Sequence, residues 1–428
     1  MRSRSHIFKA FRSIQAIFFT LILVSCKEDP VIVQKKIFEL EITPSYSTAD
    51  RDNWVIISNS QGEPVTASSF ESGQTLELTV DSRKISEVVT ITFFSYIPIA
   101  YSASARDFYF FNSYTNITPG GKWFLKRSPS LPAETAGDIT LNIVNLPDQS
   151  YDLSVSSFNR RNGITGTLGG TTVKLAVSLR ESPSDLFISI TGNNPRYKKI
   201  DAIISGQDIS LDFTKDFMAY DHLYPVSFNS PFFLGTVKGF ITSLDATQNT
   251  NTNYHEHSFY SGNTNQLQVG VNDGYPFYIT DWSANFLDGS RVGYYKVGDA
   301  PSASSFHLQN VNFEILNSNL NGISFKADAG LTYCYNNWGS VDDFSQNAPV
   351  INWQTARPVT SQGAVLTKIP DEVLKAYPYL NILFSRLSYK NSTFVMNLNG
   401  TTYESYISDQ WSTNSFAPKP REWYSITK

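Results

Sequence analysis

Short runs in which apolar and polar residues alternate recur along the whole chain. In the first, Phe38, Leu40 and Ile42 alternate with Glu39 and Glu41. Successive side chains of a strand point to opposite faces, so each run places one face on a core and the other toward water. The pattern predicts an all-β protein of two or three antiparallel sandwiches, rather than parallel strands joined by helices. Similar runs occupy residues 76–80, 89–93, 139–143, 151–155, 173–179, 186–190, 323–327 and 394–398.

Turn residues separate several of these runs and predict hairpins. The dipeptide Asp288-Gly289 is the strongest signal, because Asp-Gly favours the two-residue turns that join antiparallel strands. Two further turns are expected at Ser60-Gln61-Gly62, between residues 54–58 and 65–70, and at Asn399-Gly400, between residues 394–398 and 403–407.

Only one segment of the C-terminal half predicts a helix, residues 371–376. Pro370 and Asp371 favour its start, because proline and acidic residues suit the first turn of a helix. Pro378 favours its end, since proline cannot continue the helical hydrogen bonds.

Two β regions are expected, residues 37–218 and residues 219–428, with a tether at 26–36. The first region has an alternative organisation as two small modules. Its segments Trp54-Val-Ile-Ile and Gly62-Glu-Pro-Val65 resemble transthyretin-like or carboxypeptidase-regulatory-like modules. That resemblance implies a small sandwich of the immunoglobulin-like or transthyretin-like kind.

Composition narrows the class of protein. Aromatic residues make up 14% of the chain and charged residues 17%, against a usual charged share of about 25%. This balance suits β-structure and argues against long helices. The formal net charge is −4, whereas a nucleic-acid surface needs clustered Lys and Arg, so a nucleic-acid partner is not expected.

The N-terminus carries the most specific signal in the chain. Four basic residues (Arg2, Arg4, Lys9 and Arg12) precede an apolar run over 14–24, which is about half the length that a membrane-spanning helix needs. This is the layout of a secretory signal peptide at residues 1–25.

The end of this segment, Leu23-Val24-Ser25-Cys26, resembles the lipobox of bacterial lipoproteins. The resemblance implies cleavage before Cys26 and acylation of its thiol, which anchors the protein to a membrane. The following Lys27-Glu28-Asp29 resembles the surface-export signal of Bacteroidota lipoproteins and implies the outer face of the outer membrane. Cleavage leaves 30 basic against 38 acidic residues, a net charge of −8.

The second cysteine, Cys334, is then left without an intrachain partner. It lies within an apolar, strand-like run, so burial as a small hydrophobic residue is expected rather than a nucleophilic role.

Metal and catalytic signals are weak. His255 and His257 would share one face of a strand and could meet one metal ion, but a solvated loop end is favoured. Asp212, Asp216 and Asp221, and the pair Asp342 and Asp343, lack the spacing of a calcium loop. The nucleophile-elbow and phosphate-loop motifs are absent, so no cofactor or catalytic residue is assigned.

Tryptophans in polar surroundings are the remaining lead, and they occur at Trp338, Trp353, Trp411 and Trp423. The first three are flanked by Asn, Asp or Gln, so their rings could stack on a sugar while the amides bind its hydroxyls. We therefore take Trp338, Trp353 and Trp411 as candidates for ligand contact.

These signals favour an outer-membrane-anchored surface lipoprotein that captures glycans or mediates adhesion without catalysis. Its expected partners are the membrane, through Cys26, and a glycan or another surface protein. The alternatives are a fimbrial subunit and a glycan-active hydrolase, whose paired carboxylates would be recognisable only in space.

Overall fold

The computed structural model describes residues 34–46, 51–99, 106–126, 135–147, 151–157, 160–168, 170–192, 194–226, 228, 230–241, 254–261, 267–320, 322–340, 349–360, 366–412 and 419–428. These residues form an all-β fold of packed sheets with a few short helices, which confirms the predicted fold class. Cys26 and the whole signal segment lie outside the described residues. Among the residues described, no helix combines the length and apolar character needed to cross a bilayer.

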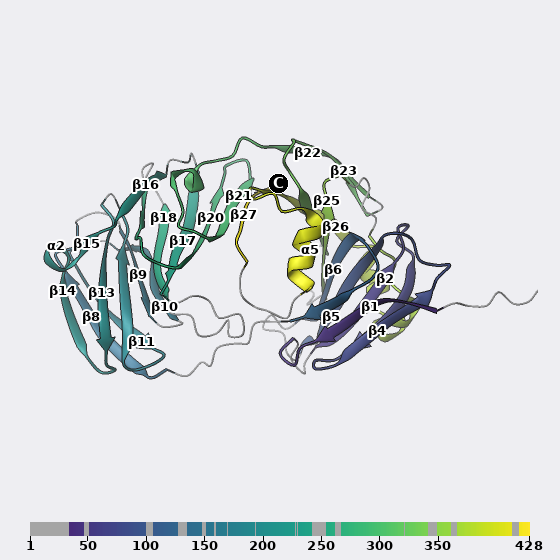
Figure 1. Cartoon of the computed structure of the whole chain (residues 1–428), viewed down its shortest axis with the longest axis horizontal. Helices are drawn as coiled ribbons and strands as arrows, with labels where there is room; N and C mark the ends of the chain where they lie inside the picture. Colours follow the sequence, from purple (N-terminus) through teal and green to yellow (C-terminus); the bar gives the residue numbers. More distant parts are fainter. Residues whose placement is uncertain are drawn as a thin grey trace, which may run out of the picture.

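A twelve-stranded sheet dominates the molecule and forms an arch (Figure 1). Every neighbouring pair in it is antiparallel except β25 and β6, which run parallel. In spatial order its strands are β18 (Tyr254–Ser261), β17 (Phe232–Phe240), β20 (Phe277–Asn285), β21 (Arg291–Gly298), β27 (Arg421–Thr427), β26 (Leu387–Asn397), β24 (Tyr333–Ser340), β25 (Val350–Pro358), β6 (Phe108–Ile117), β5 (Val89–Ile97), β2 (Asp52–Ser58) and β3 (Pro64–Phe70).

This sheet crosses the expected boundary between residues 218 and 219. Strands β2, β3, β5 and β6 come from the N-terminal half but join the C-terminal strands through the β25–β6 pair. The strands therefore do not divide at residue 218. The error has a physical reason, because strand pairing between distant segments leaves no local mark on the sequence.

Inside the arch, one face of the sheet carries α5 (Tyr403–Trp411), and we call it the concave face (Figure 1). A small sheet of β4 (Thr75–Asp81), β1 (Gln34–Ile42) and β7 (Lys122–Leu125) packs on the same face. Their shared core includes Phe38, Leu40, Val55 and Ile57, together with Ile407 of α5. Residues 34–36, which were expected in the tether, belong to β1 instead.

On the opposite face, two covers bury a second layer of side chains. Over one half lie β16 (His222–Val226), β19 (Leu267–Val271), η2 (Ala303–Phe306), β22 (Phe313–Asn319) and β23 (Gly322–Ala327). Over the other half lie α3 (Asp371–Ala376) and α4 (Leu380–Phe384). Strands β2 and β5 are buried on both faces, which explains their nearly continuous apolar runs.

A separate sandwich occupies residues 137–219 at one end of the arch (Figure 1). Its core is mainly aliphatic, with Leu141, Leu153, Val177 and Ile188 fully buried. One sheet has the order β10 (Arg160–Leu168), β9 (Tyr151–Ser157), β12 (Ser184–Ile190), β13 (Arg196–Ile203) and β15 (Met218–Ala219). The other contains β11 (Thr172–Leu179), β8 (Gly137–Val144) and β14 (Asp208–Asp212), and α2 (Phe213–Asp216) follows it.

Two of the three predicted hairpins and the predicted helix agree with the structure. The hairpins at residues 60–62 and 288–289 and the helix at 371–376 are confirmed. The hairpin at Asn399-Gly400 is wrong, because Tyr403–Trp411 is the helix α5. Thr402 caps this helix by accepting a hydrogen bond from the Ser405 amide, and Tyr403, Tyr406 and Ile407 recur at helical spacing.

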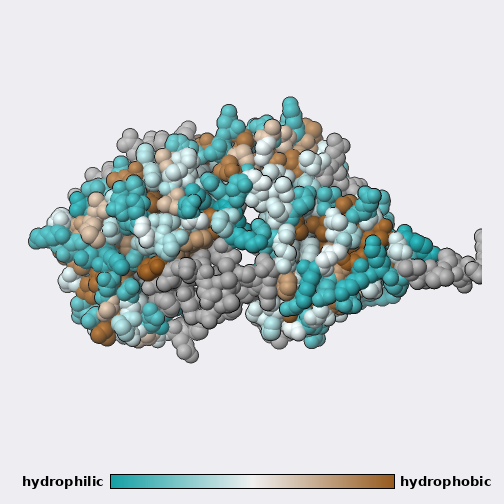
Figure 2. Space-filling view, viewed as in Figure 1, coloured by the Kyte–Doolittle hydropathy of each residue, from teal (hydrophilic) through white to brown (hydrophobic). Residues whose placement is uncertain are grey.

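The surface visible in Figure 2 is mainly hydrophilic, and its hydrophobic residues form small scattered patches. A protein with this surface has no broad apolar face on the side shown.

Candidate functional site

Two of the three tryptophans proposed for ligand contact are core residues. Trp338 and Trp353 are each only 1% exposed, so the expectation that their rings face a ligand is wrong. Trp353 stacks on Phe111 at 4.6 Å between ring centroids and donates its Nε1–H to the Ser113 hydroxyl. Both lie on interior strands, and both rings point away from the concave face into the core under α3 and α4.

The polar neighbours of these tryptophans lie on the concave face instead, because side chains alternate along a strand. Asn337 donates to Asn391 at 2.7 Å and accepts a hydrogen bond from Gln354 at 3.0 Å. The amide pattern in the sequence was therefore a correct signal of a polar surface. The prediction was wrong only about the face, because the amides and not the tryptophan rings lie on the exposed side of each strand.

Trp411 holds α5 on the sheet. Its ring stacks in parallel on Trp123, with 5.6 Å between centroids and 3° between planes, and packs against Phe93 and Tyr114. The ring is half-buried in this aromatic cluster. Trp411 thus positions the helix, whereas its neighbours Asp409 and Gln410 face a cavity.

That cavity, which we call the α5 cavity, has a volume of about 250 Å³ on the concave face. Its floor comes from β24, β26 and β27, and α5 forms one wall. Both aromatic rings and hydrogen-bonding side chains line it. The lining residues are Tyr333, Tyr335, Thr393, Val395, Asn397, Thr401, Tyr406, Asp409, Gln410, Arg421, Trp423 and Ser425.

The aromatic side of the α5 cavity is held rigidly. Tyr406 stacks on Tyr333 at 4.7 Å between centroids, and its hydroxyl accepts a 2.6 Å hydrogen bond from Tyr335. Trp423 stacks on Tyr295 at 5.4 Å, and both rings project from neighbouring strands on the same face. Burial raises the pKa of Tyr335 and of Tyr406, so both hydroxyls stay protonated as neutral hydrogen-bonding groups.

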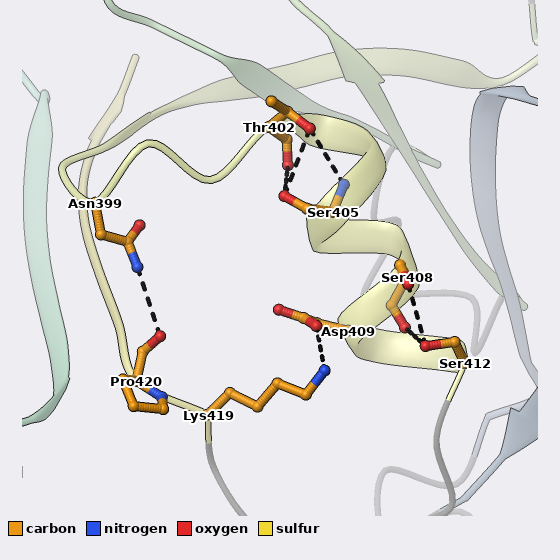
Figure 3. A network of polar contacts seen from close by, with 8 residues as sticks. All are labelled: Asn399, Thr402, Ser405, Ser408, Asp409, Ser412, Lys419 and Pro420. Carbon is orange, nitrogen blue, oxygen red and sulfur yellow. Dashed lines mark hydrogen bonds and ion pairs between the residues drawn. The ribbon is translucent and has the colours of Figure 1, made fainter.

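The polar side combines charges and an amide. Asp409 forms a 2.5 Å ion pair with Lys419, which links α5 to the segment just before β27 (Figure 3). Arg421 lies over the ring of Tyr295, with 5.1 Å from its guanidinium carbon to the ring centre. Asn397 donates to the Thr401 carbonyl at 2.7 Å, which fixes its orientation. The cavity therefore offers hydrogen-bond donors and acceptors beside ring faces.

The His255-Glu256-His257 segment is a buried strand segment, and the expectation of a solvated loop end is wrong. It lies in β18, where His255 is 6% exposed and His257 is 2% exposed. His257 Nδ1 contacts the hydroxyls of Ser189 at 2.6 Å and Tyr220 at 2.9 Å. His255 stacks on Phe187 and contacts the Tyr275 hydroxyl at 2.5 Å. The two histidines therefore join the sandwich to the large sheet.

Burial governs the ionisation of this pair. It lowers the pKa of His257 to about 3 and that of His255 to about 4, and for His255 the nearby Lys199 charge lowers it further while Asp201 opposes. Two glycines make the packing feasible. A Cβ on Gly270 would lie 2.3 Å from the ring of Tyr220, and one on Gly239 would lie 2.3 Å from the ring of Tyr275.

The acidic groups noted in the sequence serve local structure. Asp212 accepts hydrogen bonds from the Thr214 amide and hydroxyl, which lower the pKa of its carboxyl and cap α2. Asp216 accepts from the Asp212 amide, and Asp221 accepts from the Asp273 amide. Asp342 and Asp343 lie outside the described residues. Within the described part of the chain, no three His, Cys, Asp or Glu side chains gather as a metal site.

Cys334 is fully buried, as expected, and burial raises the pKa of its thiol. The sequence singled out Trp423 among polar residues, but it gave no sign of Tyr335 or Tyr406. Tyr406 was hidden by the hairpin assigned to its segment, although its spacing from Tyr403 and Ile407 was a helical signal.

The comparisons with protein families and with curated sequences found no relative of this chain. No protein-family model matches the chain, and no curated protein sequence matches it either. The candidate function therefore depends on the chemistry of the α5 cavity and of the N-terminal segment.

Proposed function

We propose that the protein is a non-catalytic glycan-binding lipoprotein, anchored through Cys26 and displayed on the outer membrane. The observation that carries the glycan-binding part is the α5 cavity, where Tyr406 and Trp423 lie beside Asp409, Arg421 and Asn397. A sugar ring has apolar C–H faces and a rim of hydroxyls. Such a ligand needs aromatic faces for stacking and fixed amide or charged groups for hydrogen bonds.

The size of the cavity points to one subsite of a longer ligand. About 250 Å³ is below the usual range for a site that encloses a whole small molecule, roughly 300–1,000 Å³. Beside it the concave face continues with the amides Asn337, Gln354 and Asn391. An extended polysaccharide could use both features, whereas a compact metabolite would use only the first.

The anchoring part of the proposal is supported by the lipobox at Leu23–Cys26 and the acidic stretch after it. Acyl chains contribute about 0.8 kcal/mol per buried methylene, so several chains hold a soluble body on a membrane durably. Metabolic labelling with a palmitate analogue should mark the wild-type protein and leave the Cys26→Ser variant unlabelled. Labelling of both, or of neither, would remove the anchor from the proposal.

The first experiment for glycan binding is affinity electrophoresis of the soluble chain from residue 27 onward, through gels that contain different polysaccharides. We expect at least one polysaccharide to retard the wild-type protein. Trp423→Ala and Tyr406→Ala should each weaken that binding tenfold or more, about 1.4 kcal/mol.

Two matched controls separate ring contact from folding. Trp338→Phe changes a buried tryptophan on the opposite face and should leave binding unchanged. Tyr406→Phe keeps the ring but loses the hydroxyl that accepts from Tyr335, so it should lose less affinity than Tyr406→Ala. Equal binding by Trp423→Ala, Tyr406→Ala and the wild type would contradict the proposal.

The two alternatives have less support. Asp409 is the only carboxylate among the described residues that line the α5 cavity, and it is paired with Lys419, whereas glycoside hydrolysis generally uses two facing carboxylates. Strand donation needs an open sheet edge, and the β18 edge of the large sheet is not open at Glu256, where its backbone is bonded to the Ser156 and Ser154 hydroxyls of the sandwich.

A further inference from the structure

A second cavity lies on the concave face, beyond α5 and over β2, β5 and β6. We call it the β5 cavity, and its volume is about 370 Å³. Two cations line it, Arg51 and Lys126, together with the neutral polar residues Asn53, Ser95 and Asn112. Among the described residues of its lining there is no Asp or Glu. In a chain with more acidic than basic residues, such a lining is unusual.

The positive charge at the β5 cavity is partly desolvated. The Nε atom of Arg51 is buried without a hydrogen-bond partner among the described residues. Burial lowers the pKa of Lys126, and the positive charge of Lys419 lowers it further. Arg51 and Lys126 line the same cavity, so an anion bound there would be attracted by both positive charges.

The neutral groups of the β5 cavity are fixed in position. Asn53 accepts a 2.8 Å hydrogen bond from the Ser95 hydroxyl and donates to the Arg51 carbonyl at 3.3 Å. Asn53 is also only 5% exposed. The backbone that carries Arg51 is therefore tied to the sheet floor before any ligand arrives, which is the preorganisation that specific binding requires.

A neighbouring cavity provides the contrast. A space of about 760 Å³ also borders Arg51, but there the carboxylates of Asp52 and Glu71 lie in the lining. Asp52 also accepts a hydrogen bond from the Tyr377 hydroxyl at 2.9 Å. Its charge is thus mixed, and it has no preference for an anion. Of the three cavities, the β5 cavity alone has cations and neutral hydrogen-bonding groups but no carboxylate among the described residues of its lining.

The α5 and β5 cavities belong to one surface. Lys126 directly follows β7, whose Trp123 stacks on Trp411 at the end of α5. Lys419, whose charge acts on Lys126, pairs with Asp409 in the lining of the α5 cavity. Strands β26 and β5 are four neighbours apart, so at about 4.8 Å per strand the cavities are separated sideways by roughly 20 Å.

We propose that the β5 cavity is an anion subsite for the same ligand, and that the ligand is an acidic polysaccharide bearing carboxylate or sulfate groups. This inference rests on the proposed glycan binding at the α5 cavity. A polymer that stacks one sugar on Tyr406 and Trp423 places an acidic group of a later residue between Arg51 and Lys126. The anion accepts hydrogen bonds from both cations and from the Asn112 amide.

The test is affinity electrophoresis and calorimetry with three polymers: polygalacturonate for carboxylate, carrageenan for sulfate, and a neutral galactan. We expect at least one acidic polymer to bind at least tenfold more tightly than the galactan. That preference should shrink as NaCl rises, because salt screens charge contacts. Comparison of the two acidic polymers identifies which anion the site takes.

Four variants locate the effect. Arg51→Gln and Lys126→Gln should each reduce binding of the acidic polymer tenfold and leave binding of the galactan unchanged. Lys126→Arg keeps the charge and should restore most of the affinity. Lys215→Gln removes an exposed cation from α2, in the sandwich, and should change nothing.

The outcomes distinguish the two proposals. If Trp423→Ala abolishes binding of every polymer while Arg51→Gln and Lys126→Gln have no effect, the anion subsite is wrong and glycan binding stands. Equal affinity for neutral and acidic polymers likewise overturns the anion subsite alone. If none of a broad set of neutral and acidic polysaccharides binds, the proposed function is contradicted and the subsite with it.

Discussion

The sandwich of residues 137–219 and the concave face around α5 are both built from β-strands, but their side chains differ in kind. The sandwich core is packed with Leu, Ile and Val, and the sandwich contains none of the seven tryptophans. The concave face places Trp123, Trp411 and Trp423 among tyrosines and amides, beside two cavities. The first region is organised for packing, and the second combines packing with exposed polar chemistry.

This difference shows where the function of a sheet protein can lie. Aliphatic side chains fill space without hydrogen-bonding groups, so a core made of them excludes ligands. Aromatic side chains pack through their faces and still present polar tips, so they can serve a core and a binding surface together. Substitutions in each region, and at the contact between them, can test that contrast.

The largest effect is expected in the sandwich core. Leu141 is fully buried, so Leu141→Ala should lower the free energy of unfolding by about 2–5 kcal/mol. The exposed Lys174 on the neighbouring strand gives the matched control Lys174→Ala, which should have little effect. The urea midpoint measured by circular dichroism should shift more than the midpoint measured by tryptophan fluorescence, since every tryptophan lies outside the sandwich. Equal shifts by both probes would show one cooperative unit.

The second effect concerns the contact between the two regions. In the unfolded chain His257 takes up a proton near pH 6.5, but in the folded protein its pKa is about 3. Between these values the unfolded state binds more protons, so stability falls as pH decreases from 6.5 toward 3. The loss from His257 alone should reach on the order of 3 kcal/mol by pH 4.

Urea titrations at several pH values measure this dependence. His257→Gln should be less stable at pH 7 but should lose less stability on acidification than the wild type. The exposed Ser408 on α5 carries no titrating group, so Ser408→Ala gives a control with a wild-type pH profile. A parallel profile for His257→Gln would contradict the buried, neutral histidine.

A smaller effect is expected at the start of α5. Thr402 accepts a hydrogen bond from the Ser405 amide at 3.2 Å, so Thr402→Ala should cost about 1 kcal/mol of stability. Ser408→Ala changes an exposed hydroxyl on the same helix and serves as the control. Because α5 forms a wall of the α5 cavity, Thr402→Ala should also weaken glycan binding. Unchanged stability would argue against the helix assignment.

The smallest effect is expected at the ion pair between Asp409 and Lys419. Both side chains are about half exposed, so Lys419→Ala should change stability by about 1 kcal/mol or less. Its consequence for binding should be clearer than its consequence for folding, since the pair borders the α5 cavity. Thermal melts and binding titrations on the same variant separate the two. A large loss of stability would contradict the expectation that this exposed ion pair contributes little to folding.

The sequence was informative wherever structure is local. Alternation identified strands such as β1 and β11, and Asp288-Gly289 identified a hairpin, because these signals depend on neighbouring residues. Pairing of β6 with β25 depends on residues more than two hundred positions apart and could not be inferred. No alternating run predicted β6 or β7, yet the aromatic residues of these strands belong to the core.

The same limit applies to the candidate site. A tryptophan beside amides on a strand leaves open which of the two faces is exposed. In the folded protein Trp353 is buried and Gln354 is exposed. Tyr335, Tyr406 and Trp423 meet only after three segments fold together. Arg51 and Lys126 likewise come from separate strand ends. No spacing in the sequence brings these residues together.

Hydrogen–deuterium exchange with and without a bound polysaccharide is the decisive test of a glycan site on the concave face, because it locates the ligand on the unmodified protein. We predict slower exchange in α5 and β27 on one side and in β5 and β6 on the other, with the sandwich of residues 137–219 unchanged. Protection confined to the sandwich, or to the cavity bordered by Glu71 and Tyr377, would contradict a glycan site on the concave face.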